Sequence, residues 1–434
     1  MKRYSEYKDS GVKWIGEIPG HWECTRIKFI ANLYGRIGFR GYNSKDLNKD
    51  GIGAITLSPS NMKDMMMDYT NVTYLSWEKY NESPEIMIQQ GDILFVKTGS
   101  SYGKSCYVDN LPQEATINPQ ILRINPLING RFLCYYFNSS LARTFTECGV
   151  VGGTIPTISQ EKVGNFIALN PPLSEQQAIV TYLDTKVAKI DEYISIAEKK
   201  ISALEELKQT IIAEAVTRGI HKEVPMKDSG VKWIGMIPEH WKVMRLSQIA
   251  YEHFISNKKI HHQNLLSLSY GQIIRKDING TNGLLPASFD TYQVVEEGNI
   301  ILRLTDLQND HKSLRVGLVK ETGIITSAYL CLAPKNMVYS KFLYFQLHAC
   351  DIKKVFYSMG DGLRQSLNYD GMRKLASVIP PLLEQQEIVN YIEAKVANIN
   401  QLCQAERSQI EKLKGYKQRL ISDVVTGKVK VTND

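Results

Sequence analysis

Two short segments of the sequence contain residue types that often take part in binding chemistry. Residues 99–105 (GSSYGKS) match a phosphate-binding loop only in part, because three residues separate the glycines where that loop needs four. The next residues, Cys106-Tyr107-Val108, are typical of a strand, whereas a phosphate site needs a helix amino terminus there. His261-His262 has no third ligand at a suitable spacing. We therefore expect neither a nucleotide site nor a bound metal.

Residues 170–173 (NPPL) are the strongest candidate for catalysis. Amino-methyltransferases use an Asn-Pro-Pro-aromatic motif, in which the amide holds the target amine and the ring stacks on the base. Here Leu173 takes the place of the ring, and a second copy of the segment has Ile379 where the first has Asn170. No glycine-rich cofactor loop accompanies the motif. We expect the prolines to set the chain direction before a helix, and we expect no catalytic residue.

The composition is typical of a globular protein with more than one domain. The chain has 434 residues, of which 43% are hydrophobic and 22% charged, and it is too long for a single core. Its net charge of +7 permits a polyanionic partner. However, residues 32–170 contain 12 basic and 12 acidic side chains, and residues 251–379 contain 15 and 11. Charge alone therefore does not indicate a nucleic-acid partner.

The cysteine content and the amino terminus predict a cytoplasmic protein. The seven cysteines are odd in number and form no Cys-x-x-Cys pair, so we expect reduced thiols. Polar residues and no apolar run follow Met1-Lys2-Arg3, which argues against a signal peptide. No stretch approaches the roughly 20 apolar residues that a membrane-spanning helix needs.

The sequence contains an internal duplication. Residues 8–31 match residues 227–250 at 16 of 24 positions, and residues 171–190 match residues 380–399 at 13 of 20. The inserts between these paired segments, 32–170 and 251–379, resemble each other only faintly, for example at Gly91-Asp92-Ile93-Leu94 and Gly298-Asn299-Ile300-Ile301. A shared frame with divergent inserts indicates that the frame binds the same partner twice, whereas the two inserts bind two different targets. Neutral drift of the inserts is the alternative.

A long helical pattern follows each Pro-Pro-Leu. Apolar residues alternate at steps of three and four from Val180 to Ala215, and again from Val389 to Val424, as in a heptad seam. Each helix would span about 40 residues, or roughly 60 Å. A parallel pair would place Lys208 against Lys417 in the seam, whereas an antiparallel pair lets each ammonium reach water. We therefore expect an antiparallel pair; packing of each helix into its own domain is the alternative.

The repeated boxes resemble those of the specificity subunit of Type I restriction–modification systems. The box SGVKWIGxIPxHW occurs at 10–22 and 229–241, and PPLxEQQ occurs at 171–177 and 380–386. In the first insert, residues 35–41, 91–94, 97–104 and 115–118 follow the recognition-domain pattern of that family in order. The second insert keeps only fragments of the pattern. The resemblance covers nearly the whole chain.

The resemblance implies that each insert is a target-recognition domain for one half of a split DNA site and that the paired helices set the gap. It implies two modification subunits, which bring S-adenosylmethionine and methylate adenine. Restriction subunits bring ATP-driven translocation and cleavage, with Mg²⁺. No cofactor is expected on this chain. A protein-interaction scaffold without DNA recognition and a self-sufficient adenine methyltransferase are the alternatives.

The expected fold is mixed α/β (α+β), with a pseudo-twofold repeat. We expect a first target-recognition domain at 1–175, a first spacer helix at 176–219, a second target-recognition domain at 220–384, a second spacer helix at 385–426, and a tail at 427–434.

Candidate DNA contacts are long polar or basic side chains on loops, which can read base edges or bind phosphates. In the first insert these are Arg36, Arg40, Tyr42, Asn43, Lys97, Thr98, Ser100, Tyr102, Lys104 and Thr154. In the second they are Arg303, Lys312, Arg315, Arg364 and Gln365. A solvated surface role is the alternative for each of them, and an ordinary turn is the alternative for the glycine-rich segment.

Candidate partner contacts lie in the repeated frame. Tryptophan is favoured at the centre of protein interfaces. The two PPLxEQQ boxes also repeat the same Gln-Gln pair. The candidates are Trp14, Trp22, Gln176, Gln177, Trp233, Trp241, Gln385 and Gln386. Packing of the tryptophans at the start of each recognition domain is the alternative.

Overall fold

The computed structural model describes residues 3–38, 41–48, 50–150, 155–221, 223–278, 288–307, 314–359 and 366–431. The contacts divide the chain into two compact units, Met1–Ala197 with Ser408–Asp434, and Glu198–Arg407. Each unit therefore contains one recognition domain together with about half of each long helix. Within the described ranges, no helix has the combination of length and apolar character that crossing a bilayer requires.

An antiparallel four-stranded sheet forms the centre of the first unit, in the order β11-β10-β13-β4. Its strands are β4 (Ala31–Gly35), β10 (Ile93–Val96), β11 (Ser105–Tyr107) and β13 (Ile121–Pro126). Because successive side chains of a strand point to opposite faces, Ile93 and Phe95 pack on helices, whereas Leu94 and Val96 pack on a second sheet. The run Ile-Leu-Phe-Val is therefore apolar throughout.

The second sheet of this unit has the order β12-β6-β9-β5, with β12 parallel to β6. Its strands are β5 (Leu47–Asn48), β6 (Ala54–Leu57), β9 (Thr73–Leu75) and β12 (Ala115–Ile117). The short helices are α1 (Ile27–Ile30), α2 (Trp77–Asn81), α3 (Gly130–Phe137), α4 (Ser140–Gly149) and α5 (Gln160–Gly164). Asn129, Ser139 and Ser159 cap the amino termini of α3, α4 and α5 through their side chains.

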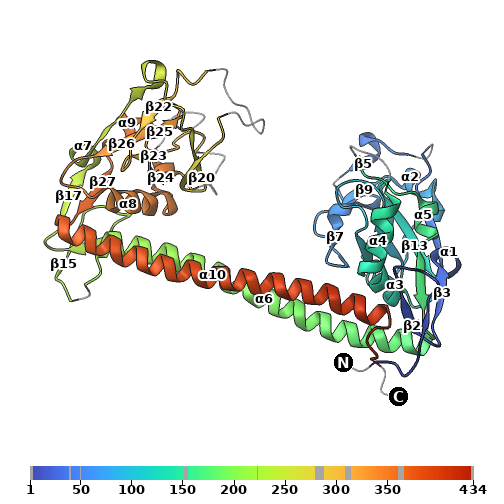
Figure 1. Cartoon of the computed structure of the whole chain (residues 1–434). Helices are drawn as coiled ribbons and strands as arrows, with labels where there is room; N and C mark the ends of the chain where they lie inside the picture. Colours follow the sequence, from blue (N-terminus) through green and yellow to red (C-terminus); the bar gives the residue numbers. More distant parts are fainter. Residues whose placement is uncertain are drawn as a thin grey trace. The chain divides into compact units, whose positions relative to one another are not determined.

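The second unit has a central sheet with the same strand order. It contains β18 (Ala250–Glu252), β23 (Ile300–Leu302), β24 (Val316–Leu318) and β26 (Leu330–Pro334), in the order β24-β23-β26-β18. Figure 1 labels β23, β24 and β26 of this sheet. Around it lie α7 (Leu246–Ile249), α8 (Ser340–Ile352), α9 (Tyr369–Met372), the sheet of β19 (Ile255–Ser256), β22 (Gln293–Val295) and β25 (Gly323–Ile325), and the hairpin of β20 (Leu266–Ser269) and β21 (Gln272–Arg275). The two inserts are only faintly similar in sequence, but each therefore contains a central sheet with the same strand order.

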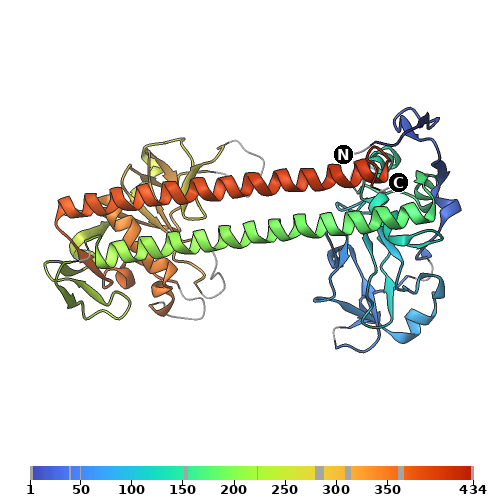
Figure 2. The ribbon, with the colours of Figure 1, turned by 90° about the horizontal axis from the view of Figure 1, so that it is seen from below.

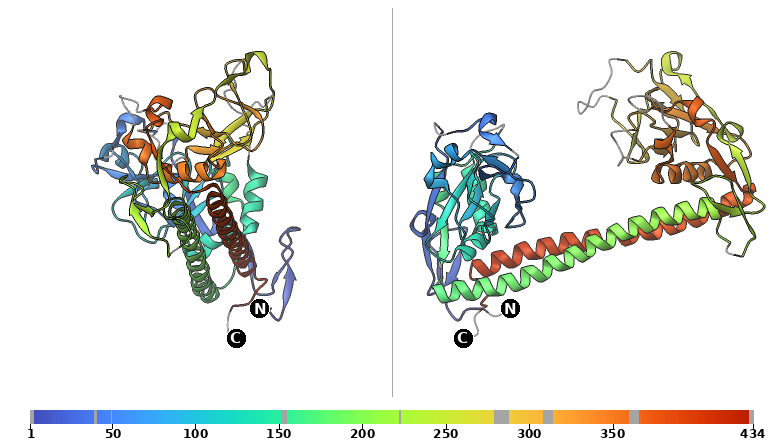
Figure 3. Two further views of the ribbon diagram at one scale, coloured as in Figure 1. Left: turned by 90° about the vertical axis from the view of Figure 1, so that its left-hand side faces the viewer. Right: turned by 180° about the vertical axis from the view of Figure 1, so that it is seen from behind.

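The described residues also form three short two-stranded hairpins. They are β1 (Tyr7–Asp9) with β2 (Glu17–Pro19), β7 (Met62–Lys63) with β8 (Met66–Met67), and β15 (Met226–Asp228) with β16 (Met236–Pro238). The first and third are the same repeated segment, and each precedes a His-Trp pair. In the first unit, Tyr4, Ile18 and Trp22 share one buried cluster with Leu420 and Val424, so the segments near the two termini pack together (Figure 3).

The two long helices are α6 (Leu173–Arg218) and α10 (Leu382–Val425), and both are unbroken (Figure 2). Each helix starts three residues before its predicted first residue and ends one residue before its predicted last residue. In the second unit, Lys200 pairs with Glu406, and Lys208 lies near Asn400, so the helices run antiparallel as predicted. In the first unit Lys417 pairs with Asp191 at 2.6 Å.

The two seam lysines differ from the prediction in one respect. Lys417 and Lys208 are only 15% and 17% exposed, and they do not simply extend into water. Lys417 binds both carboxylate oxygens of Asp191, and Lys208 pairs with Glu205 and approaches Asn400. A polar partner at each position satisfies an ammonium that the neighbouring helix would otherwise bury.

Candidate functional sites

Two short antiparallel pairs bring the repeated boxes together. In the first unit, β3 (Glu23–Arg26) follows the His-Trp pair and pairs with β14 (Ile167–Asn170), which precedes Pro-Pro-Leu. In the second unit, β17 (Lys242–Arg245) pairs with β27 (Ala376–Ile379) in the same way. Each insert therefore leaves the frame and returns to it at one place, and each recognition domain ends where its long helix begins.

A glutamate in the first turn of each long helix binds the His-Trp pair at the start of the same recognition domain. Trp22 donates from Nε1 to Glu175 at 2.9 Å, and His21 Nε2 lies 2.8 Å from the same carboxylate. We call these three residues the first joint. Trp22 is completely buried and packs against the carboxyl end of α10, where a Cβ on Gly427 would lie 3.1 Å from the indole.

The second joint has the same geometry. Trp241 donates from Nε1 to Glu384 at 3.0 Å, and His240 Nε2 lies 2.7 Å from that carboxylate. The indole is again completely buried, and a Cβ on Gly219, just after α6, would lie 3.3 Å from it. Each joint therefore connects one recognition domain to the start of one long helix and the end of the other.

The glutamine that follows each glutamate is also used inside the molecule. Gln176 accepts from the backbone N–H of Asn129 and donates to the carbonyl of Pro171. Gln385 accepts from the N–H of Tyr339 and donates to the carbonyl of Pro380. Both side chains are buried. The repeated Glu-Gln pair therefore fixes the recognition domain on its helix.

These contacts correct part of the predicted partner surface. Trp22, Trp241, Gln176 and Gln385 are buried and bonded inside the frame, so they are not available to another subunit. The other four candidates differ in exposure. Trp14 is 61% exposed, Gln177 and Gln386 are exposed, and Trp233 is half-buried. The sequence missed His21, Glu175, His240 and Glu384, although both boxes repeat them.

The second joint offers a direct stability test. We expect Glu384→Ala to destabilise the second unit by about 2–3 kcal/mol, because the buried indole N–H of Trp241 loses its acceptor. The matched control is Glu387→Ala, since Glu387 is exposed and lies one turn along the same helix. Denaturant unfolding followed by tryptophan fluorescence would measure both. Equal effects of the two substitutions would contradict the role of Glu384.

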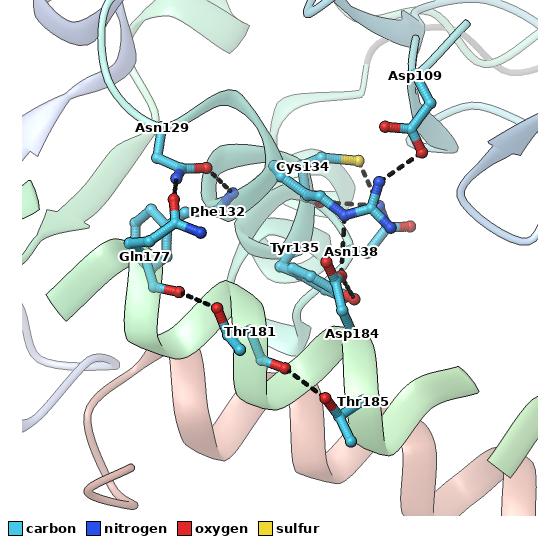
Figure 4. A network of polar contacts seen from close by, with 11 residues as sticks. Asp109, Asn129, Phe132, Cys134, Tyr135, Asn138, Gln177, Thr181, Asp184 and Thr185 are labelled. Atoms are coloured by element: carbon cyan, nitrogen blue, oxygen red, sulfur yellow. Dashed lines mark hydrogen bonds and ion pairs between the residues drawn. The ribbon is translucent and has the colours of Figure 1, made fainter. Parts of the chain in front are cut away.

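A second contact between the first recognition domain and α6 lies on α3. Arg131 binds Asp109 at 2.5 Å and Asp184 at 2.9 Å, and the hydroxyl of Tyr135 also donates to Asp184 (Figure 4). Burial lowers the pKa of Arg131, but its bonds to the two carboxylates outweigh this effect and raise the pKa overall. At the equivalent positions of the second unit, Lys341 pairs with Glu393 at 2.7 Å. Both recognition domains are therefore fixed to a long helix by an ion pair.

One end of the first central sheet gathers segments that are far apart in the sequence. β4 and β10 end there and β11 and β13 begin there, since Gly35 pairs with Leu122 and Val96 with Ile121. Lys97 follows β10 directly, and a Cβ on Gly35 would lie 3.4 Å from its ammonium and 3.2 Å from Gln160 Oε1. We call this the Lys97 end of the sheet.

Lys97 is the predicted contact with the clearest indication of a missing partner. Within the described residues, its ammonium forms no hydrogen bond or ion pair, and burial lowers its pKa. Exposed amides of Gln120 and Gln160 lie in the segments beside it, since Lys97 donates its N–H to the carbonyl of Gln120. The sequence reasoning missed these two glutamines because they occur outside any glycine-rich or basic motif.

The glycine-rich segment is a turn between β10 and β11, as the alternative interpretation had it. Gly103 has φ +81°, and a Cβ there would lie 3.0 Å from Thr146. Lys104 is bonded internally to the carbonyl of Met62, and Thr98 forms a bridge with Thr157. Ser100 is exposed, and Tyr102 is half-buried. Only some of the polar side chains of this turn are therefore accessible to a ligand.

Arg36 corrects another predicted DNA contact. Arg36 is 7% exposed, and its guanidinium donates to the carbonyl of Ile117 and the hydroxyl of Thr116. It therefore joins the Lys97 end to β12 of the second sheet. Tyr42 stacks on this guanidinium at 5.0 Å, and Asn43 is exposed and caps a short 3₁₀ turn with its side chain.

The second unit has an equivalent sheet end, where β18 and β23 end and β24 and β26 begin. Arg303 follows β23 and donates its N–H to the carbonyl of Arg315. We call this the Arg303 end. Arg315 is fully buried, with its guanidinium donating to the carbonyls of Arg303, Thr305 and Asp306. Arg315 therefore supports the loop, and the prediction that it contacts DNA is wrong; Arg303 is half-buried.

The remaining predicted contacts lie outside the described residues. They are Arg40, Thr154, Lys312, Arg364 and Gln365. Among the described residues, no three His, Cys, Asp or Glu side chains gather in a way that could hold a metal ion. His261 lies 4.0 Å from Asp290 and is exposed.

His348 in α8 makes the second unit sensitive to acid. Burial, with a smaller contribution from the charge of Lys208, lowers the pKa of His348 from 6.5 to about 4, and its Nε2 lies 3.0 Å from Gln209. Between pH 6.5 and 4 the unfolded chain binds this proton and the folded chain does not, so stability falls as the pH falls. The expected loss is about 3 kcal/mol.

Hydrogen exchange of α8 at pH 7.5 and pH 4 would measure this loss. His348→Asn places there the residue type found at the equivalent position 138 of the first unit. The variant should lose most of the pH dependence in α8, while α3 and α4 serve as the internal control. An unchanged pH dependence in the variant would assign it to another group.

Comparison with known proteins agrees with the resemblance that the repeated boxes indicate. The family described as the type I restriction modification DNA specificity domain matches residues 21–206. The putative type I restriction enzyme MjaX specificity subunit of Methanocaldococcus jannaschii is 24% identical, with 98% of each chain covered. The type I restriction enzyme EcoBI specificity subunit of Escherichia coli is 20% identical, covering 98% of this chain and 90% of that one.

The fold has a counterpart among solved structures. A chain from a study of complex assembly and conformational transition of the type I R-M system has a TM-score of 0.66 at 15% identity, covering 95% of this chain and 99% of that chain. The doubled boxes, the repeated sheet and the two long helices agree with the sequence matches over nearly the full length. Over nearly its full length the chain is therefore similar to specificity subunits of type I restriction–modification systems, and its residues 21–206 match the DNA specificity domain of those systems.

Proposed function

We propose that this chain reads a DNA target of two short halves separated by a fixed gap, one half for each recognition domain. The observation that carries the proposal is the repeat of one central sheet and one joint in both units, while the residues at the two sheet ends differ. Two recognition domains that are attached to the helices in the same way, but have different loops at their sheet ends, suit two different half-sites. The continuous helices α6 and α10 would set the gap.

We assign Lys97 to the DNA backbone at the first half-site. Its ammonium is unpaired within the described residues, and a phosphate would supply the missing charge. We expect Lys97→Ala to weaken binding of all duplexes by a similar factor and to lower the slope of log K against log salt by about 1. Lys162→Ala is a suitable control, because Lys162 already donates to the carbonyl of Gly149.

Two equivalent patches on the long helices are the proposed docking sites for two copies of a modification subunit. In the first unit, Tyr193 and Tyr416 are 61% and 41% exposed, beside Tyr182. In the second, the positions 209 residues away hold Leu402 and Tyr391, and Leu207 is equivalent to Tyr416; all three are at least 38% exposed. Exposed apolar side chains off the seam suit a protein partner.

The partner subunits would bring the chemistry. We propose that S-adenosylmethionine binds on the modification subunits, and that ATP and Mg²⁺ bind on restriction subunits. The chain itself would then contribute target selection and placement. Its near-match to a methyltransferase motif is structural in this view, because the amide of Asn170 accepts from Gln176 at 3.0 Å at the start of α6.

Methylation-sensitive long-read sequencing tests the proposal. A methylation-free host would express the chain with the modification subunit encoded beside it, and control hosts would express each alone. We expect adenine methylation only with both proteins, at one motif with two halves and a fixed gap. Methylation of the same motif by the modification subunit alone would show that this chain is not the reader.

A further inference from the structure

The most exposed large hydrophobic side chain of the described residues is Tyr270, at 85% exposure. It occupies the tip of the hairpin formed by β20 and β21, where Ser269 pairs with Gln272 and only Tyr270-Gly271 form the turn. Within the described residues the ring stacks on no other ring and the hydroxyl has no hydrogen-bond partner. The side chain therefore contributes little to the folded unit itself.

The backbone of Tyr270 is strained. Its φ is +46° and that of Gly271 is +76°, which is the pattern of a turn that favours Asn-Gly or Gly-Gly. A bulky residue with positive φ is uncommon, because its Cβ approaches the neighbouring carbonyl. An aromatic side chain at this position thus costs stability and gains no internal contact, which suggests an external role.

The hairpin packs closely against the segment that leads into β24 and against β24 itself. A Cβ on Gly271 would lie 2.9 Å from the Cβ of Leu314, and a Cβ on Gly317 would lie 2.6 Å from Leu268. Both close approaches leave no space between the hairpin and the start of β24. Because β24 begins at the Arg303 end, Tyr270 projects from the same sheet end as the loop after β23.

We propose that Tyr270 is a specificity-determining residue that packs its ring against base edges of the half-site read by the second recognition domain. The inference rests on the proposed function, since it requires that the Arg303 end faces DNA. A flat ring with one hydroxyl, flanked by the exposed amide of Gln272, can contact bases through apolar surface and one hydrogen bond. A single projecting ring also suits a groove better than a flat protein surface.

Tyr270→Asn separates a DNA contact from a structural role. Asparagine tolerates positive φ, so this variant should raise the melting temperature of the second unit by about 2–4 °C. It should also weaken binding of the assembled complex to a duplex with the methylated motif by about tenfold or more. Tyr270→Phe should keep most of the affinity, and Tyr251→Ala, at a half-exposed tyrosine of β18, is the matched control.

Probe duplexes altered in one half of the motif locate the contact. Tyr270→Asn should reduce discrimination against changes in one half only, and leave discrimination in the other half unchanged. Wild-type affinity with wild-type discrimination would overturn the proposal, and so would failure of the variant to assemble with the modification subunit, which would indicate a protein contact. If the wild-type complex itself shows no sequence preference, the proposed function is wrong rather than the assignment of Tyr270 alone.

Discussion

Replacing Arg123 by cysteine is expected to destabilise the first unit by about 3–5 kcal/mol, because it leaves a buried carboxylate without its partner. Asp92 is completely buried and Arg123 is 7% exposed, and Nε of the arginine lies 2.6 Å from the carboxylate. Asp92 also accepts from the N–H of Gln89, which fixes the turn before β10. Asp92→Asn should cost a similar amount, because it leaves the guanidinium uncompensated.

The second unit shows how the pair can be replaced. Asn299 and Cys331 occupy the equivalent positions, and the thiol lies 3.5 Å from the amide oxygen. Asn299 still accepts from the N–H of Glu296, so the turn keeps its hydrogen bond without any buried charge. We therefore expect the double variant Asp92→Asn/Arg123→Cys to be more stable than either single variant.

A double-mutant cycle measured by denaturant unfolding tests this expectation. The coupling energy between the two positions should amount to several kcal/mol, since the charges are in direct contact. Additive losses would mean that the pair contributes no coupled interaction. Arg275→Cys is a suitable control, because Arg275 and Glu321 form an exposed pair whose loss should cost far less than the loss of a buried pair.

Lengthening both long helices by three heptads is expected to move the two recognised half-sites apart by about nine base pairs. Three heptads add roughly 31 Å of helix, and each base pair rises about 3.4 Å. The added length is close to one DNA turn of about 34–36 Å, so both recognition domains would face nearly the same side of the duplex as before. Methylation at the wild-type gap should disappear.

The insertions belong at facing positions of the antiparallel pair. Lys200 faces Glu406 and Lys208 faces Asn400, so a point after Ala203 in α6 and a point before Cys403 in α10 keep the contacts on both sides. Insertion into one helix only is the control, because the seam then loses its register. A methylated motif with the original gap in the doubly lengthened chain would exclude the helices as the ruler.

The sequence alone predicted the elements that follow periodicity and repetition. Heptad spacing from Val180 and from Val389 located both long helices to within three residues, because a seam repeated over many turns leaves little choice of period. The lysines at 208 and 417 indicated antiparallel pairing for an electrostatic reason. The strand after the glycine-rich segment also followed from composition, as β11 confirms.

Burial and pairing over long sequence distances were decided only by the tertiary structure. Trp22 and Trp241 read as interface residues in the sequence, but they bind Glu175 and Glu384, more than 140 residues away, because β3 with β14 and β17 with β27 bring the boxes together. Arg36 and Arg315 read as DNA contacts, but carbonyl groups of their own domains take up their donors.

The sequence by itself thus determined the duplication, the long helices and the family resemblance, since these depend on the identity and spacing of residues along the chain. The tertiary structure decided which polar side chains are free. An arginine on a loop has the same donors whether it supports a neighbouring strand or meets a phosphate, and only the atoms around it distinguish the two. Lys97 stays a candidate and Tyr270 becomes one because, within the described part of the chain, the ammonium of Lys97 and the ring of Tyr270 have no internal partner.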